Sequence, residues 1–337
     1  MLFRSHSSQL AQNPLMTRIR MPGHELGAGY DDTHEILHTY RRRTFRATGG
    51  SMRSADRLTE PFAYHGEGPF WDARTGRLLC VDVYAADVVA VSGAGGIERF
   101  AVPSAAATVI RRRARSGFVI GTQRGVVVAD EELHTFASMV ELVDDPAVRT
   151  NDGGCDPLGG FVIGTMAADE RGGRGTVYRV SPDGEVVELL SPVSISNGVQ
   201  WSADGSRVYY IDTPTRRVDV FDVDAHTGAW SRRRVHIQID EGHGFPDGMA
   251  IDDAGGLWIA MWGAGTVNHY DADGRLVERI RVPGVSQVSA CAFGGARYDA
   301  LFITTSREGQ ANPAPDSGAV FVLQTSVRGA ALPEFGV

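Results

Sequence analysis

Residues 256–270 read GLWIAMWGAGTVNHY: a glycine, an apolar run, a short loop and a second apolar-rich run. Apolar runs bounded by glycine-rich turns are typical of paired β-strands. Five further segments repeat the arrangement, at residues 76–91, 117–128, 160–180, 207–223 and 300–323. Successive segments start roughly 40–50 residues apart, which is the period of four-stranded propeller blades. The repeat therefore predicts an all-β fold, a six-bladed β-propeller.

The turns between the runs agree with this architecture. Pro-Asp-Gly at residues 182–184 and Ala-Asp-Gly at residues 203–205 and 272–274 supply the positive φ that a tight hairpin turn needs. No helical pattern separates the runs after residue 55, which argues against a doubly wound α/β fold. Counts of five or seven blades stay open, because a terminal strand is the hardest to place.

The composition excludes several classes of function. The chain of 337 residues has a net charge of −8, which argues against binding to nucleic acid or to an anionic membrane as its main task. All 33 basic residues are arginine, so Schiff-base chemistry and a Walker A phosphate loop, which both need lysine, are excluded. The three cysteines, Cys80, Cys155 and Cys291, form no Cys-x-x-Cys pair and predict reduced thiols in a cytoplasmic protein. We expect a monomer or a weak homo-oligomer.

Residues 1–52 differ from the rest and predict a flexible N-terminal extension to a catalytic domain at residues 53–337. The extension is polar and lacks the apolar core of a signal peptide. Residues 34–38 read HEILH and match the zinc motif H-E-x-x-H, but no third-ligand motif follows. We therefore interpret the match as chance rather than as a metalloprotease site.

Four short motifs precede strands of the repeat, each placing an oxygen-bearing side chain beside a glycine. They are HGEGPFW at residues 65–71, RTNDG at 149–153, SNGV at 196–199 and FPDGM at 245–249. A single Asn-Gly or Asp-Gly is usually a turn dipeptide without a ligand. Their common phase in successive repeats instead indicates a site at the mouth of the central channel, where glycine lets the backbone approach the axis.

Together with GTM at residues 164–166 and CAFGG at 291–295, these motifs resemble the senescence-marker-protein/gluconolactonase family, which includes regucalcin. The similarity covers roughly residues 55–325. It implies a six-bladed propeller with one divalent metal ion at the channel mouth. By motif match, the resemblance implies Glu67, Asn197 and Asp247 as metal ligands, and Arg149, Asn151 and Asp169 as residues on the substrate side. Asp169 stands where regucalcin-like members carry a glutamate, one methylene longer.

The implied ligands are two carboxylates and one carboxamide. Such an oxygen-only set with a charge of −2 favours the hard cations Ca²⁺, Mg²⁺ and Mn²⁺, whereas Zn²⁺ more usually recruits His or Cys. We expect Ca²⁺, with Mg²⁺, Mn²⁺ or Zn²⁺ as alternatives. The resemblance implies a metal-dependent lactonase whose small-molecule substrate is a sugar lactone such as gluconolactone. We expect the lactone carbonyl to be polarised at the metal site and Asp247 to be the catalytic residue, positioning or deprotonating the attacking water.

Two other functions stay open. The same metal site could hydrolyse another ester or an organophosphate, because the pocket wall decides the substrate. The chain could also be a non-catalytic calcium-binding propeller. A Ser-His-Asp esterase has no anchor here, since no G-x-S-x-G occurs. The basic run at residues 111–113 is expected to be a solvated turn.

Overall fold

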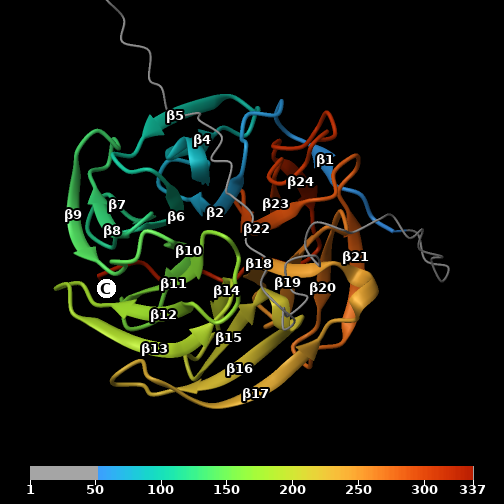
Figure 1. Ribbon diagram of the computed structural model, residues 1–337. Helices are drawn as coiled ribbons and strands as arrows, with labels where there is room; N and C mark the ends of the chain where they lie inside the picture. The colour runs from blue at the N-terminus through green and yellow to red at the C-terminus, as the bar shows by residue number, and fades with distance from the viewer. Residues whose placement is uncertain (1–51, 337) are drawn as a thin grey trace, which may run out of the picture. The chain divides into compact units, whose positions relative to one another are not determined.

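The computed structural model describes residues 52–336, which form six four-stranded antiparallel sheets arranged in a ring (Figure 1). The six-bladed propeller expected from the repeat is confirmed. Residues 1–51 of the expected extension, with the HEILH motif, lie outside the described residues. Within residues 52–336 no helix is long and apolar enough to cross a membrane.

Each blade takes one strand from each of four positions, counted outward from the channel. The first strands are β2 (Gly66–Asp72), β6 (Ala107–Arg112), β10 (Val148–Cys155), β14 (Ser196–Trp201), β18 (Phe245–Ile251) and β22 (Val288–Gly294). The second strands are β3 (Arg77–Asp82), β7 (Phe118–Thr122), β11 (Phe161–Ala167), β15 (Arg207–Asp212), β19 (Leu257–Trp262) and β23 (Ala300–Thr305). The third strands are β4 (Asp87–Val91), β8 (Gly125–Ala129), β12 (Gly175–Val180), β16 (Arg217–Val223), β20 (Thr266–Tyr270) and β24 (Phe321–Gln324). The outer strands are β5 (Ile97–Ala101), β9 (Phe136–Glu141), β13 (Val186–Val193), β17 (Trp230–Gln238), β21 (Leu276–Arg281) and β1 (Asp56–Arg57).

The ring is closed by the start of the propeller pairing with its end. The two-residue strand β1 pairs antiparallel with β24 and completes the blade that otherwise comes from the last strands of the chain (Figure 1). This pairing covers the edge that β24 would leave open, as a closed β architecture requires.

The strength of the ring comes from apolar packing between blades. Fully buried side chains such as Leu78, Ile120, Ile163, Ile211 and Trp258 lie on second strands of different blades. Both faces of these strands are covered, which explains why their sequences read as continuous apolar runs rather than as an alternation. The outer strands are largely exposed, including several of their apolar side chains such as Val187 and Val235.

All six first strands carry a register shift near their starts. The shifts lie between Glu67 and Phe70, Ala107 and Val109, Thr150 and Gly153, Asn197 and Val199, Pro246 and Met249, and Val288 and Ala290. A β-bulge turns a side chain away from the regular alternation and is common beside active sites. Here the repeated bulge sits at the same level in every blade, at the channel mouth.

The C-terminal residues 326–336 pass the opposite end of the channel. The Ala330 N–H donates to the carbonyl of Ile251 at 3.1 Å, and the Phe335 N–H donates to the carbonyl of Arg112 at 2.9 Å. Phe335 is buried and packs edge-to-face on Phe161. Because these residues link three blades, the described chain end stabilises the ring at the far end of the channel.

The basic run at residues 111–113 is not the solvated turn expected from its sequence. Arg111 and Arg112 end the strand β6, and the Arg112 side chain is 5% exposed. Arg111 donates through Nη1 to the carbonyl of Gly68 at 3.0 Å, and its Nη2 lies 3.9 Å from Asp152 Oδ1. The expectation was wrong because Arg111 and Arg112 are the last residues of β6, a first strand that lines the channel, and not part of a turn.

Candidate metal and substrate site

A cavity of about 230 Å³ opens at the end of the channel where the first strands begin. Five of the six residues expected at the site line it: Glu67, Arg149, Asn151, Asn197 and Asp247. They come from β2, β10, β14 and β18, the strands carrying the four motifs. The equivalent positions of the motifs in the repeat therefore place their side chains at the same height in the channel.

Glycines next to the ligands let neighbouring strands approach closely. Gly68 has φ +55°, and a Cβ there would lie 3.0 Å from the Cα of Val109. A Cβ on Gly198 would lie 2.9 Å from the carbonyl oxygen of Asp247. A larger residue at either position would push apart the strands that carry the candidate ligands, which explains the X-Gly dipeptides in physical terms.

The carboxylates of Glu67 and Asp247 are buried without a basic partner. Glu67 is 8% exposed and accepts one hydrogen bond, from the Gly68 N–H at 3.1 Å. Within residues 52–336 no arginine or histidine forms an ion pair with either carboxylate. The neighbouring acids Glu308 and Asp152 are paired instead, with His65 and Arg111.

The electrostatics of this pair follow from its burial. Burial, reinforced by the negative charge of Asp152, raises the pKa of Glu67 to about 8. Burial also raises the pKa of Asp247 well above its usual range, and the charge of Glu67 adds to the effect. Ionising both carboxylates in this buried site costs free energy. A bound cation would offset that cost, so the pair forms a favourable cation site.

The Asn197 side chain is oriented by Thr213 of the same blade, which is itself held by a backbone carbonyl of the next blade. The Thr213 hydroxyl donates its one proton to the carbonyl of Pro246 at 2.8 Å. It must therefore accept from Asn197 Nδ2, which lies 2.7 Å away. This arrangement fixes the amide so that Oδ1, the atom able to bind a metal, lies on the other side.

Replacing Thr213 with valine should therefore weaken cation binding without removing a ligand. Valine keeps the shape of threonine but neither accepts from Asn197 nor donates to Pro246. We expect a roughly 10- to 100-fold rise in the Kd for Ca²⁺, the range found for groups that orient metal ligands. Calorimetric titration measures it, and Thr213→Ser, which keeps the hydroxyl, should restore binding. Unchanged affinity in Thr213→Val would contradict this role.

Arg149 and Asn151 are joined beside the candidate ligands. Arg149 Nη1 donates to Asn151 Oδ1 at 2.6 Å, and Asn151 Nδ2 donates to Asn197 Oδ1 at 3.0 Å. Arg149 is 6% exposed, and its guanidinium lies over the ring of Tyr84, 5.7 Å from the centroid. The buried arginine thus places a positive charge and an amide at one side of the cavity.

Asp169 is not brought to the cavity. Its side chain is 43% exposed and pairs with Arg171 at 2.8 Å, on the solvent side of the turn after β11. The next residue, Glu170, lines the cavity instead and has φ +59°. The left-handed backbone at Glu170 redirects the turn, and motif spacing does not encode such a change in direction.

Several lining residues were missed by the sequence reasoning. They are His65, Gln287, Glu308 and Gln310, together with the apolar side chains of Met166, Ile195, Phe245 and Trp262. His65 stood inside a quoted motif, and Trp262, at the end of the apolar run 257–262, could be read either as a pocket or as a core residue. Glu308 and Gln310 follow the last second strand, β23, in a segment that resembles an ordinary polar loop.

The residues present fit a divalent cation held by oxygen ligands. Within residues 52–336 there is no group of three His, Cys, Asp and Glu side chains arranged for a metal ion. The donor set therefore depends on the amide of Asn197 as the third ligand, beside the buried carboxylates of Glu67 and Asp247. Such a set suits a hard cation, and three protein ligands leave positions for water and substrate.

Comparison with known proteins gives matches over most of the chain. Residues 65–307 match the family model described as the SMP-30/gluconolactonase/LRE-like region. Regucalcin of Gallus gallus is 33% identical over 270 residues, covering 77% of this chain and 90% of the relative. Pentonolactonase XacC of Haloferax volcanii is 34% identical over 281 residues, covering 80% of this chain and 93% of the relative.

A solved structure shares the fold at similar identity. The calcium-binding protein regucalcin from Agrobacterium tumefaciens superposes with a TM-score of 0.79 at 30% sequence identity. The superposition covers 85% of this chain and 98% of that structure, so the whole propeller has a counterpart.

Proposed function

The chain belongs to the SMP-30/gluconolactonase/LRE-like family, and from that premise we propose that it is a divalent-metal-dependent hydrolase of sugar lactones. Residues 53–337 would form its catalytic domain. One observation carries the proposal: two buried carboxylates without basic partners share a cavity with an oriented amide and a buried arginine. A relative is named pentonolactonase, which supports a lactone as the substrate class.

Glu67, Asn197 and Asp247 would hold the cation, with Ca²⁺ proposed first and Mg²⁺, Mn²⁺ or Zn²⁺ as alternatives. When bound, a divalent cation supplies a Lewis acid for the lactone carbonyl oxygen and favours ionisation of water. Oxygen ligands in a cavity of this kind suit Ca²⁺ best, because it accepts irregular geometry and a high ligand number.

The chain's own residues would then carry the proton transfers. Asp247 accepts a proton from the attacking water as the new C–O bond forms at the lactone carbonyl. The ring C–O bond breaks, and the same proton is returned to the departing ring oxygen, so that water is added overall and a hydroxy acid results. Arg149 and Asn151 orient the substrate oxygens, and the wall that includes Phe245 and Trp262 limits access of bulk water.

A substrate panel tests the proposal. With Ca²⁺ present, we expect turnover of glucono-1,5-lactone and of pentono-1,4-lactones, followed by acid release with a pH indicator. Acyl-homoserine lactones, aryl esters and a phosphotriester should be turned over far more slowly. A preference for the phosphotriester or the aryl ester would contradict the lactonase function and identify an organophosphate or ester hydrolase instead. Tight calcium binding without turnover of any substrate would instead identify a non-catalytic calcium-binding propeller.

A further inference from the structure

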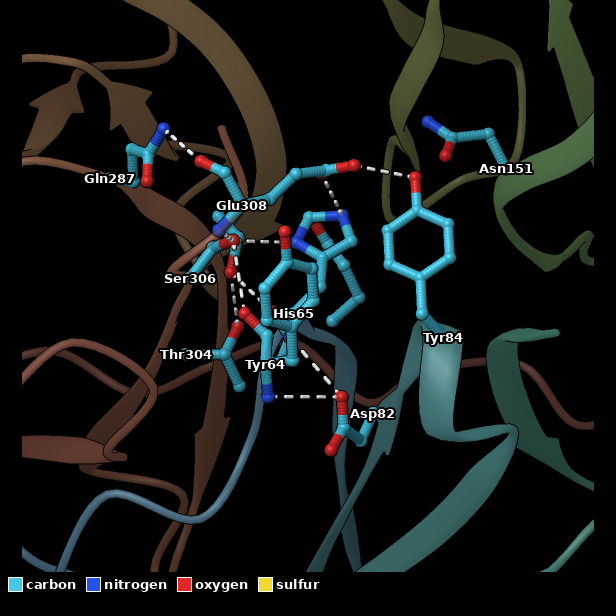
Figure 2. Close-up of polar contacts among 12 residues, drawn as sticks. Tyr64, His65, Asp82, Tyr84, Asn151, Gln287, Thr304, Ser306 and Glu308 are labelled. Atoms are coloured by element: carbon cyan, nitrogen blue, oxygen red, sulfur yellow. Dashed lines mark hydrogen bonds and ion pairs between the residues drawn. The ribbon is translucent and has the colours of Figure 1, made fainter. Parts of the chain in front are cut away.

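Glu308 lines the cavity from the loop after β23, with the Tyr84 hydroxyl between its carboxylate and Arg149. Its carboxylate contacts Tyr84 and His65 of the first blade, which neighbours the last blade in the ring (Figure 2). Oε1 accepts from the Tyr84 hydroxyl at 2.5 Å, and Oε2 lies 3.3 Å from His65 Nε2. The side chain is 26% exposed and lines the cavity.

The partners of Glu308 hold it in one position. His65 is fixed at its other nitrogen, because Nδ1 lies 2.9 Å from the Ser306 hydroxyl (Figure 2). The Glu308 N–H donates to the same hydroxyl at 2.9 Å, and its carbonyl accepts from Gln287 Nε2 at 2.7 Å. Backbone and side chain are therefore both anchored, which is the preorganisation that a specificity residue requires.

Arg149 and Glu308, which both line the cavity, have complementary hydrogen-bonding character. Arg149 has donors only, whereas an ionised Glu308 has acceptors only. Tyr84 connects them, since its hydroxyl lies 3.5 Å from Arg149 Nη2 and donates to Glu308. A hydroxyl group both donates and accepts, so a ring carrying several hydroxyls can bond to Arg149 and Glu308 at once. An alkyl, acyl or aryl substituent would leave the Glu308 carboxylate partly desolvated without a new donor, which costs free energy.

We propose that Glu308 is a specificity-determining residue that accepts a hydrogen bond from a substrate hydroxyl and selects neutral, polyhydroxylated lactones. The proposal rests on the lactonase function proposed above. Tyr84 and His65 act as positioning residues that hold the carboxylate toward the cavity. The negative charge of Glu308 also disfavours substrates that carry an anionic group there.

The test compares two lactones with the same ring, glucono-1,5-lactone and unsubstituted δ-valerolactone. In Glu308→Gln we expect kcat/KM for gluconolactone to fall about 10- to 100-fold, mainly through KM, as expected for loss of a hydrogen bond to a charged group. The value for δ-valerolactone should change less than about threefold, because that ring has no hydroxyl to lose. Tyr84→Phe should shift the same ratio in the same direction by a smaller factor.

Glu98→Gln is the matched control, because Glu98 lies on the outer strand β5 and pairs with Arg77 at the surface. It should leave both substrates unaffected. Equal losses on the two lactones in Glu308→Gln would show a structural or general catalytic role and overturn the proposal. An unchanged ratio with unchanged rates would overturn it as well.

A binding measurement separates this proposal from the proposed function. If the wild-type protein hydrolyses neither lactone, the lactonase function has failed, and binding of D-glucopyranose in the presence of Ca²⁺ then tests Glu308 alone. Calorimetric binding that is about tenfold weaker in Glu308→Gln would support the hydroxyl contact. Equal binding by both proteins, or none by the wild-type protein, would overturn it.

Discussion

Asp247→Asn should lower kcat/KM for the best lactone by at least about 10³-fold while the propeller stays folded. General-base catalysis alone contributes about 10²–10⁴-fold, and the same change removes one charge from the proposed cation site. Steady-state kinetics in saturating Ca²⁺ measures the first effect, and a calcium titration measures the second. We expect both kcat and calcium affinity to fall, because one side chain serves both roles.

The stability of this variant should move in the opposite direction. Burial, together with the charge of Glu67, raises the pKa of Asp247, so its ionised form destabilises the metal-free protein. Asparagine is neutral and nearly isosteric. In a chelator at neutral pH, the Tm of Asp247→Asn should equal or exceed that of the wild-type protein, which would separate lost activity from lost fold.

Asp252→Asn provides a matched control just beyond the other end of β18. Asp252 is 3% exposed and accepts hydrogen bonds from the Gly256 N–H and from Trp258 Nε1, far along the strand from the cavity. Removing its charge should cost about 1–3 kcal/mol of unfolding free energy, the range for buried polar groups that lose a partner. The folded protein should keep its kcat. Full activity in Asp247→Asn, or equal activity losses in both variants, would contradict the role assigned to Asp247.

The sequence predicts the repeated parts of this fold well and its ends poorly. Second strands such as residues 257–262 are covered on both faces, so their burial requires a continuous run of apolar residues, and that run can be recognised in the sequence. The strand β1, residues 56–57, is too short to have a pattern, and its position is set by the free edge of β24. The position of Phe335 could not be predicted for a related reason. Its partners, Phe161 and the carbonyl of Arg112, lie in different blades and are brought together only when the ring closes.

The residues of the candidate site also fall into those that the sequence predicts and those that it does not. Glu67, Asn197 and Asp247 occupy equivalent positions in three repeats. They therefore lie at the same height along the channel, and the repeat in the sequence predicts that they come together. Glu170 replaces Asp169 in the cavity because one residue in the left-handed region turns the chain, and spacing along the sequence carries no such information. Glu308 needs a contact between the first and last blades, which no local motif records.

The metal-free protein should become less stable as pH rises from about 4.5 to about 8. The folded-state pKa of Glu67 is raised from its usual 4.5 to about 8, and that of Asp247 is raised too. Between the unfolded and folded pKa values, the folded protein holds protons that the unfolded chain has released, so unfolding becomes more favourable as pH rises. The stabilisation by these protonated groups is full below about pH 4.5 and is lost above about pH 8. Thermal unfolding in a chelator measures the slope, which Glu67→Gln should reduce.

Calcium should reverse this dependence and restore activity. Cation binding requires both carboxylates to be ionised, so binding releases protons and strengthens as pH rises toward 8. At a hundredfold excess over Kd the cation should add about 2.7 kcal/mol, or roughly 4–5 °C in Tm for a domain of this size. The gain at a fixed calcium concentration should be larger at pH 8 than at pH 5.5. Chelation should abolish turnover, and calcium should recover it. A Tm that is the same with chelator and with calcium at both pH values would show that the two buried carboxylates do not form a cation site, because their mutual repulsion could then not be relieved by the ion.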